Sequence, residues 1–213
     1  MRRANCGELK ANAAPEADRE EIKKVGYNII VLDLDGTLTN RDKVITPRTK
    51  EALMRAQEQG KIVVLASGRP TAGVKPLAEE LELARFGSFI LSYNGGMITN
   101  CRTGEAVFSA LLPLDSNEKI ISLAKEYRVD ILTYEGEEII TNNADCTYAH
   151  KEAAINHLPL RQVEDMASYV TFQVPKFLML DDGDYLATVE PRVKAAMGKN
   201  FRTLFPGGPS QGD

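Results

Sequence analysis

The first half of the chain alternates between short apolar runs and segments with helix signals. The apolar runs at residues 29–34, 61–67 and 88–92 each lead into polar or glycine residues. Residues 29–34 predict a strand that is buried on both faces, as in a parallel sheet. Three strand–loop–helix units in succession predict an α/β fold with a doubly wound parallel sheet.

Helix signals lie between these runs. Thr46 suits an N-cap, Pro47 suits the first helical position, and Gly60 suits the stop of the helix between them. The helix that follows the second run is predicted to break at Pro76, because proline lacks a backbone N–H.

The pattern changes in the second half of the chain. A hairpin is predicted over residues 97–108, and a helix over 115–127 with a capping box formed by Asp115 and Glu118. Shorter elements follow. Strands are predicted at 129–134, 137–141, 176–180 and 201–205, and helices at about 145–155 and 185–198.

These patterns divide the chain into four parts. Residues 1–26 are polar and predict an extension, residues 27–110 form the α/β core, and residues 111–205 form an α+β module. Residues 206–213 are rich in Gly, Pro and Ser and predict an unstructured tail.

Composition narrows the class of protein. The chain has 213 residues, 43% hydrophobic and 26% charged, with a formal charge of −4. These values are typical of a globular protein and give no basic footprint for nucleic acid. No apolar run is long enough to cross a bilayer. Three widely spaced cysteines without a C-x-x-C motif favour reduced thiols and a cytoplasmic location.

Two aspartates mark the end of the first predicted strand. Asp33 and Asp35 are two positions apart, so they project from the same side of the strand as two like charges held close together. A hard cation would relieve this repulsion, and Mg²⁺ is the usual one. Gly36 permits a tight turn directly afterwards. An ordinary Asp-Gly turn is the simpler interpretation, but it gives Asp33 no role.

Polar residues follow the next two predicted strands as well. Ser67 ends the second and Asn94 follows the third. The carboxyl ends of parallel strands meet at one edge of a sheet, where ligands bind. We therefore expect Ser67 and Asn94 to lie close to the aspartates.

Three motifs together resemble a known family. "DLDGT" at residues 33–37, "ASGRP" at 66–70 and "SYNGG" at 92–96 are similar to motifs of the haloacid dehalogenase (HAD) superfamily. More narrowly, they resemble its Cof-type phosphatases, which carry a large α+β cap of class IIB after the third strand. The resemblance runs from about residue 27 to about residue 205.

The resemblance implies roles for the residues at the strand ends. Asp33 would be the nucleophile that forms an aspartyl-phosphate, and Asp35 would act as general acid and then general base. Mg²⁺ would bind Asp33 and the backbone carbonyl of Asp35. Thr37 would brace the loop. The expected phosphate-binding or substrate-binding residues are Gly36, Thr37, Ser67, Gly68, Arg69 and Asn94.

The end of the sequence departs from the family pattern. The family places two further core strands after the cap, with a lysine and a second acidic loop that completes the Mg²⁺ site. Residues 206–213 resemble neither. The sequence thus predicts a Cof-type phosphatase that lacks the second half of its core, with impaired activity. An exposed sheet edge would then invite self-association.

Three further features have simpler interpretations than a functional site. Residues 181–184, "DDGD", predict a turn with Asp184 as N-cap rather than the acidic loop. Lys176 is expected at the cap surface or in a cap pocket. His150 and His157 have no carboxylate partner at a spacing that would suit zinc.

Three functions remain open. The first is a Mg²⁺-dependent phosphatase of small phosphorylated metabolites such as sugar phosphates, acting through an aspartyl-phosphate. The second is a non-catalytic protein that binds phosphorylated ligands or a partner. The third is a receiver-like signalling domain, but receivers place the acceptor aspartate at the third strand, where this chain has Asn94.

Overall fold

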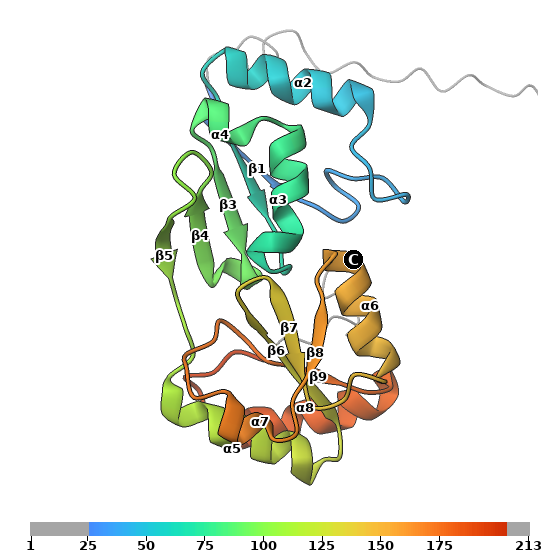
Figure 1. Ribbon diagram of the computed structural model, residues 1–213. Helices are drawn as coiled ribbons and strands as arrows, with labels where there is room; N and C mark the ends of the chain where they lie inside the picture. The colour runs from blue at the N-terminus through green and yellow to red at the C-terminus, as the bar shows by residue number, and fades with distance from the viewer. Residues whose placement is uncertain (1–25, 204–213) are drawn as a thin grey trace, which may run out of the picture.

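The structure, a computed structural model, describes residues 26–203 as a core and a cap (Figure 1). The core sheet has five strands in the order β1-β2-β3-β4-β5. Strands β1, β2 and β3 are parallel, and β4 and β5 form the predicted antiparallel hairpin. Their bounds are Ile29–Asp33 (β1), Ile62–Ala66 (β2), Phe89–Ser92 (β3), Met97–Asn100 (β4) and Ala106–Ser109 (β5).

Three helices cover one face of this sheet. They are α2 (Pro47–Glu58), α3 (Thr71–Glu80) and α4 (Leu83–Phe86). Since the parallel strands advance in one direction, right-handed crossovers place every connecting helix on the same side. Strand and helix residues accordingly form one buried hydrophobic cluster. It includes Val63, Leu65 and Ile90 of the sheet, together with Leu53 of α2 and Val74 of α3.

Strand β1 corrects one prediction. It is an edge strand within the described residues, not a strand buried on both faces, and Ile29 and Val31 are 56% and 58% exposed. Their alternation with the half-buried Ile30 and Leu32 shows that β1 is covered on one face only. The α/β class is confirmed, but the described helices cover one side of the sheet rather than both.

The helix after β2 corrects another prediction. Helix α3 runs through Pro76, and the break comes at Glu82, whose φ of 52° ends the helical path. By contrast, α2 begins as predicted, with Pro47 at its start and the Thr46 side chain accepting a hydrogen bond from the amide of Thr49.

The cap is an α+β module that begins after β5. Its four-stranded sheet has the order β8-β7-β6-β9. The bounds are α5 (Leu114–Glu126), β6 (Asp130–Glu135), β7 (Glu138–Thr141), α6 (Thr147–Asn156), β8 (Leu160–Gln162), α7 (Met166–Tyr169), β9 (Leu178–Leu180) and α8 (Gly183–Met197).

The cap departs from the sequence prediction in four places. Strand β8 and helix α7 were not predicted. The capping box of Asp115 and Glu118 does not form, because α5 begins at Leu114 with Pro113 as its N-cap. Residues 201–203 are irregular rather than a strand, and residues 204–213 lie outside the described part, as do residues 1–25.

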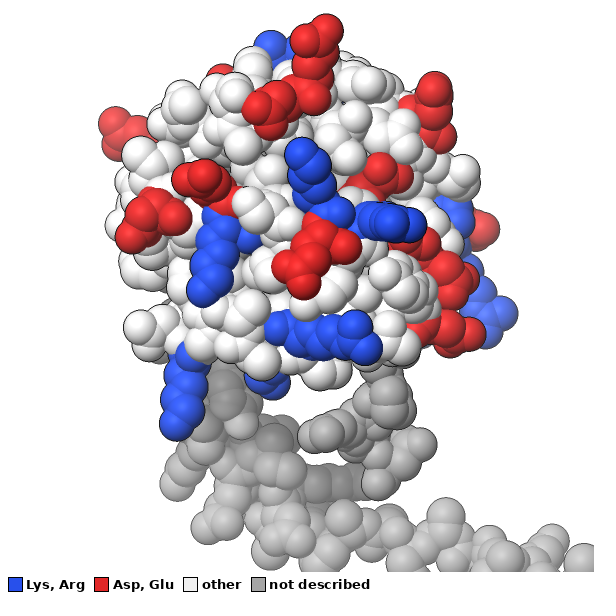
Figure 2. All heavy atoms as spheres, turned by 90° about the horizontal axis from the view of Figure 1, so that it is seen from below, with Lys and Arg blue, Asp and Glu red and all other residues white. Residues whose placement is uncertain are grey.

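The carboxyl ends of β1, β2 and β3 point toward the cap (Figure 1). Helix α6 packs against α3, and an ion pair of 2.6 Å joins Lys75 of α3 to Glu137 in the β6–β7 turn. On the outer face of the cap, basic and acidic side chains are interspersed (Figure 2). No described helix has the length and apolarity needed to cross a membrane.

Candidate active site

A tight turn follows β1 and carries both aspartates. The amide of Leu38 donates to the carbonyl of Asp33 at 3.1 Å, and the amide of Thr39 donates to the carbonyl of Leu34 at 2.9 Å. Gly36 has a φ of +86°, which glycine adopts without strain. Leu34 is fully buried between the two aspartates and anchors the turn in the core.

Thr39, more than Thr37, braces this turn. The Thr39 hydroxyl donates to the carbonyl of Leu34 at 2.9 Å, and the side chain is buried. Thr37 contributes its backbone amide, which donates to the same carbonyl at 3.4 Å, while the residue is exposed. The sequence signal for Thr39 was present in "DGTLT", but two threonines two residues apart cannot be told apart without the structure.

Asp33 lies at the carboxyl end of β1, beside Ala66 at the end of β2. It is exposed, and none of the ion pairs among the described residues involves it. A carboxylate that no cation neutralises keeps its oxygens available to a metal ion or an electrophile. This is the environment that the nucleophile prediction requires.

Asp35 is held by two cations. Lys43 Nζ and one terminal nitrogen of Arg69 each lie 2.8 Å from the same carboxylate oxygen, Oδ1. Burial raises the pKa of Asp35, but the hydrogen bonds and charges of Lys43 and Arg69 outweigh it and lower the pKa below its ordinary value. Asp35 is therefore a carboxylate in this state.

Arg69 is thus engaged differently from the sequence prediction. It was expected to bind phosphate, but one terminal nitrogen pairs with Asp35, and the other donates to the carbonyl of Ile155 at 3.2 Å. Ile155 belongs to α6, so Arg69 joins the core to the cap. The Nε of Arg69 is buried and has no hydrogen-bond partner.

The loops after β2 and β3 are locked together. The amide of Ser67 donates to Leu91, the amide of Asn94 donates to the carbonyl of Ser67 at 3.1 Å, and the Ser67 hydroxyl accepts from the amide of Arg69 at 3.2 Å. A Cβ on Gly68 would lie 2.9 Å from Nδ2 of Asn94, so any larger residue at position 68 would displace the Asn94 side chain. The structure therefore brings Ser67, Gly68 and Asn94 together as predicted.

Cap residues that the sequence did not predict complete the site. Lys176, in the segment before β9, donates from Nζ to the carbonyl of Gly68 at 2.7 Å. Tyr134 of β6 lies beneath this ammonium, and its ring packs edge-on against Tyr93 of the core at 5.6 Å between centroids. No local sequence signal could have placed Lys176 on a loop that is 108 residues away.

The strand ends supply a partial set of oxygen ligands for Mg²⁺. The carboxylate of Asp33 and the main-chain carbonyl of Asp35 are the hard donors that this ion prefers, and Mg²⁺ completes its shell with water and phosphate oxygens. The side chain of Asp35 is occupied by its cations. Within residues 26–203, no group of three or more His, Cys, Asp or Glu side chains is arranged to hold a metal.

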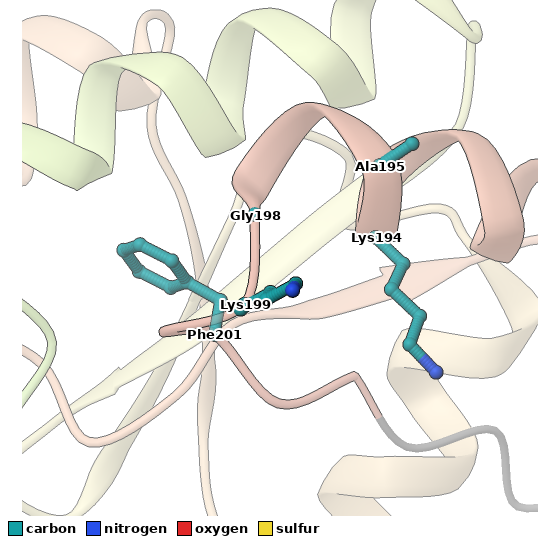
Figure 3. Close-up of a pocket in the computed structure, with 5 residues that line it drawn as sticks. All are labelled: Lys194, Ala195, Gly198, Lys199 and Phe201. Atoms are coloured by element: carbon teal, nitrogen blue, oxygen red, sulfur yellow. The ribbon is translucent and has the colours of Figure 1, made fainter.

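The simpler interpretation of "DDGD" agrees with the structure, with one change. Asp182 rather than Asp184 is the N-cap of α8, since its Oδ1 accepts from the amides of Asp184 and Tyr185. A shallow hollow also borders the C-terminal end of α8 and is lined by Lys194, Ala195, Gly198, Lys199 and Phe201 (Figure 3). It lies on the cap, outside the site at the strand ends.

Comparisons with known proteins agree with this architecture. A solved haloacid dehalogenase-like hydrolase from Bacteroides thetaiotaomicron is 45% identical, with a TM-score of 0.74, over 79% of this chain and 63% of that one. YxeH of Bacillus subtilis is 28% identical over 84% of this chain and 65% of its own length. The 5-amino-6-(5-phospho-D-ribitylamino)uracil phosphatase YwtE of the same species is 39% identical over 83 residues, 39% of this chain and 27% of its own.

The chain therefore spans less than two thirds of the length of YxeH and of the Bacteroides hydrolase. The family of haloacid dehalogenase-like hydrolases matches residues 30–210, which is most of the sequence and includes both the core and the cap. The chain belongs to the haloacid dehalogenase-like hydrolase family.

Proposed function

We propose that the protein is a Mg²⁺-dependent phosphatase that hydrolyses phosphate monoesters through an aspartyl-phosphate on Asp33. The observation that carries this proposal is the exposed carboxylate of Asp33, which has no described ion pair and lies at the carboxyl end of β1, the end that points toward the cap (Figure 1). Family membership supports hydrolase chemistry. The proposal applies to the whole protein, because the relatives are longer than this chain.

In the first step, an oxygen of Asp33 attacks phosphorus and the ester P–O bond breaks. The leaving alkoxide takes a proton from Asp35. In the second step, Asp35 accepts a proton from water, whose oxygen attacks phosphorus, and the bond between phosphorus and Asp33 breaks to release inorganic phosphate. A bound Mg²⁺, held by Asp33 and the carbonyl of Asp35, neutralises charge on the phosphoryl group.

The ion pairs of Asp35 suit the second step better than the first. A carboxylate is the form that accepts a proton, and Lys43 and Arg69 favour that form. Before Asp35 can donate a proton, it must gain one and weaken these contacts. We therefore expect substrate binding to rearrange Lys43 or Arg69.

We propose small phosphorylated metabolites such as sugar phosphates as substrates. The cap contacts the core directly through Lys176 and α6, and a cap docked against the strand-end loops favours a small substrate over a macromolecule. YwtE supports this class, since the substrate in its name carries a phosphate on a polyhydroxylated ribityl chain. The unpaired thiols of Cys101 and Cys146 support a cytoplasmic location.

We expect the 213 residues alone to turn over slowly. The lysine and second acidic loop that the family resemblance places after the cap have no counterpart in this sequence. A second candidate, favoured by the engagement of Asp35 with two cations, is a chain that binds phosphorylated ligands or a partner without turnover.

Phosphate release by the purified chain distinguishes the two. We would measure it with p-nitrophenyl phosphate and a panel of sugar phosphates, with and without Mg²⁺, against Asp33→Asn. Turnover that needs both Mg²⁺ and Asp33 supports the phosphatase and contradicts the expected impairment. Activity equal to that of Asp33→Asn supports binding without turnover by these residues.

A further inference from the structure

Lys176 crosses from the cap to the loop at the end of β2. Its Nζ donates to the carbonyl of Gly68 at 2.7 Å, and the side chain is half-buried. Gly68 lies between Ser67 and Arg69 in the loop that follows β2. This loop is part of the candidate phosphate site. A lysine of the cap therefore reaches the core loop at the end of β2.

The ammonium group of Lys176 has hydrogen-bond donors without a described acceptor. A lysine carries three N–H donors, and the described hydrogen bonds use one of them. Its charge lies 5.4 Å from the centroid of the Tyr134 ring, and none of the described ion pairs includes it. A half-buried cation without a carboxylate partner is costly unless an anion joins it.

The carboxylate whose charge acts on Lys176 already has other hydrogen-bond partners. The Glu152 carboxylate accepts from the Tyr134 hydroxyl at 2.7 Å and from Nδ2 of Asn156 at 2.8 Å. Burial lowers the pKa of Lys176, and the charge of Glu152 only partly opposes this effect. Glu152 therefore influences Lys176 from a distance and leaves the donors of Lys176 free.

The other cations at the site are committed elsewhere. Lys43 and Arg69 both contact Oδ1 of Asp35, and the remaining terminal nitrogen of Arg69 contacts the carbonyl of Ile155. Among the described lysines and arginines that contact the strand-end loops, Lys176 alone has no acidic partner. Its position beside Ser67 and Gly68 suits a phosphoryl oxygen.

We propose that Lys176 is the cap residue that binds the phosphoryl group of the substrate, with its free donors directed at an oxygen held beside Ser67. The ligand class is a phosphate monoester or inorganic phosphate. This inference rests on the proposed function for the location of the phosphate, but it assigns a binding role to a residue of the cap. Because the contact joins cap to core, phosphate binding then favours the closed cap.

Binding of inorganic phosphate with Mg²⁺ to the 213-residue chain tests the proposal by calorimetry. Lys176→Met keeps an unbranched side chain over Tyr134 but removes the charge. Loss of a charge-assisted hydrogen bond should weaken phosphate binding roughly 10- to 100-fold. Lys176→Arg should retain most of the affinity and reduces the risk that the result reflects misfolding.

Lys75→Met is the matched control. Lys75 also bridges core and cap, through Glu137 at 2.6 Å, but both side chains are exposed and neither has a described hydrogen bond to the strand-end loops. Its phosphate affinity should stay within about twofold of the unmodified chain, as expected for an exposed ion pair. The affinity of the unmodified chain should also fall more steeply with salt than that of Lys176→Met.

The outcomes separate this inference from the proposed function. Equal phosphate affinity in Lys176→Met and the unmodified chain overturns the role of Lys176 while leaving the phosphatase proposal intact. Phosphate binding that weakens in Lys176→Met, without Asp33-dependent turnover, supports the inference and contradicts the phosphatase proposal for this chain. Absence of phosphate binding by the unmodified chain overturns the inference and also contradicts a phosphatase role for these 213 residues alone.

Discussion

Gly73→Ala tests whether the cap is docked on the core as the structure shows. Gly73 lies in α3, where α6 of the cap packs against it. A Cβ at position 73 would lie 2.2 Å from Oδ1 of Asn156, 3.0 Å from its Cγ and 3.1 Å from its Cβ. The shortest of these distances is more than about 1 Å below ordinary contact, so one of the two helices must move.

Asn156 has little freedom to yield. It is 2% exposed, and its Nδ2 donates to the carbonyl and the carboxylate of Glu152 at 2.9 and 2.8 Å. Overpacking of this kind costs about 1–3 kcal/mol. Alanine gains about 0.8–1 kcal/mol over glycine inside a helix. With the cap docked, Gly73→Ala should therefore lower the free energy of unfolding by up to about 2 kcal/mol, whereas without docking it should raise it.

Urea unfolding of Gly73→Ala, Asn156→Ala and the double variant measures this contact. Asn156→Ala removes the amide that the new methyl group meets, so the two sites should show a coupling energy of about 1–2 kcal/mol. Gly183→Ala in α8 is the control, because nothing lies within 4 Å of the position that its methyl group would take, and it should be neutral or stabilising. Stabilisation by Gly73→Ala equal to that of the control, with no coupling to Asn156, would refute the docked arrangement.

Two further predictions concern Asp35 and the exposed face of the sheet. Burial raises the pKa of Asp35, but Lys43 and Arg69 lower it overall, so Lys43→Met should raise this pKa in a carboxyl NMR titration. The stabilisation from Asp35 is present above its unfolded pKa of 3.8 and is lost as the pH falls through the lower folded value. The ion pair with the exposed Lys43 contributes less than about 1 kcal/mol to this stabilisation. An unchanged pKa of Asp35 in Lys43→Met would contradict the ion pair. For the sheet, we propose that a second copy of the chain covers the edge and open face of β1, so Val31→Lys should shift light-scattering masses toward monomer, whereas Val44→Lys, at a similarly exposed loop residue, should not. Equal association of the two variants would exclude this face as the contact.

The positions of the strand ends could be predicted from sequence because they follow from local rules. An apolar run that ends in polar residues defines a strand and its direction, and parallel strands share one edge. These rules placed Asp33, Ser67 and Asn94 at one edge. A backbone bond joins Asn94 to Ser67, and Asp33 lies beside Ala66, the residue before Ser67. The family motifs added Gly68, which lies directly against the Asn94 side chain.

Burial was harder to predict, because it depends on neighbours rather than on the strand itself. Ile29 and Val31 are as apolar as Val63 and Leu65, yet they lie on the face of the sheet that the described helices leave open, whereas Val63 and Leu65 lie on the covered face. The apolar sequence of β1 is therefore compatible with burial on both faces, but it does not show which face another element covers. Helix α3 makes a similar point, since it tolerates Pro76 and ends instead at the positive φ of Glu82.

Charge pairing was the least predictable part of the site. Arg69 is separated from Asp35 by 34 residues and from Ile155 by 86, and Lys176 is separated from Gly68 by 108. A long, flexible lysine or arginine side chain can reach many acceptors. Which acceptor it contacts depends on how the cap and the core pack together. Arg69 was predicted to bind phosphate because of its motif, yet it neutralises Asp35, while Lys176 was predicted at the cap surface or in a cap pocket and instead contacts the loop after β2. The motif indicates the loop at which we propose that phosphate binds, but only the docked cap shows which cation beside that loop lacks an acidic partner.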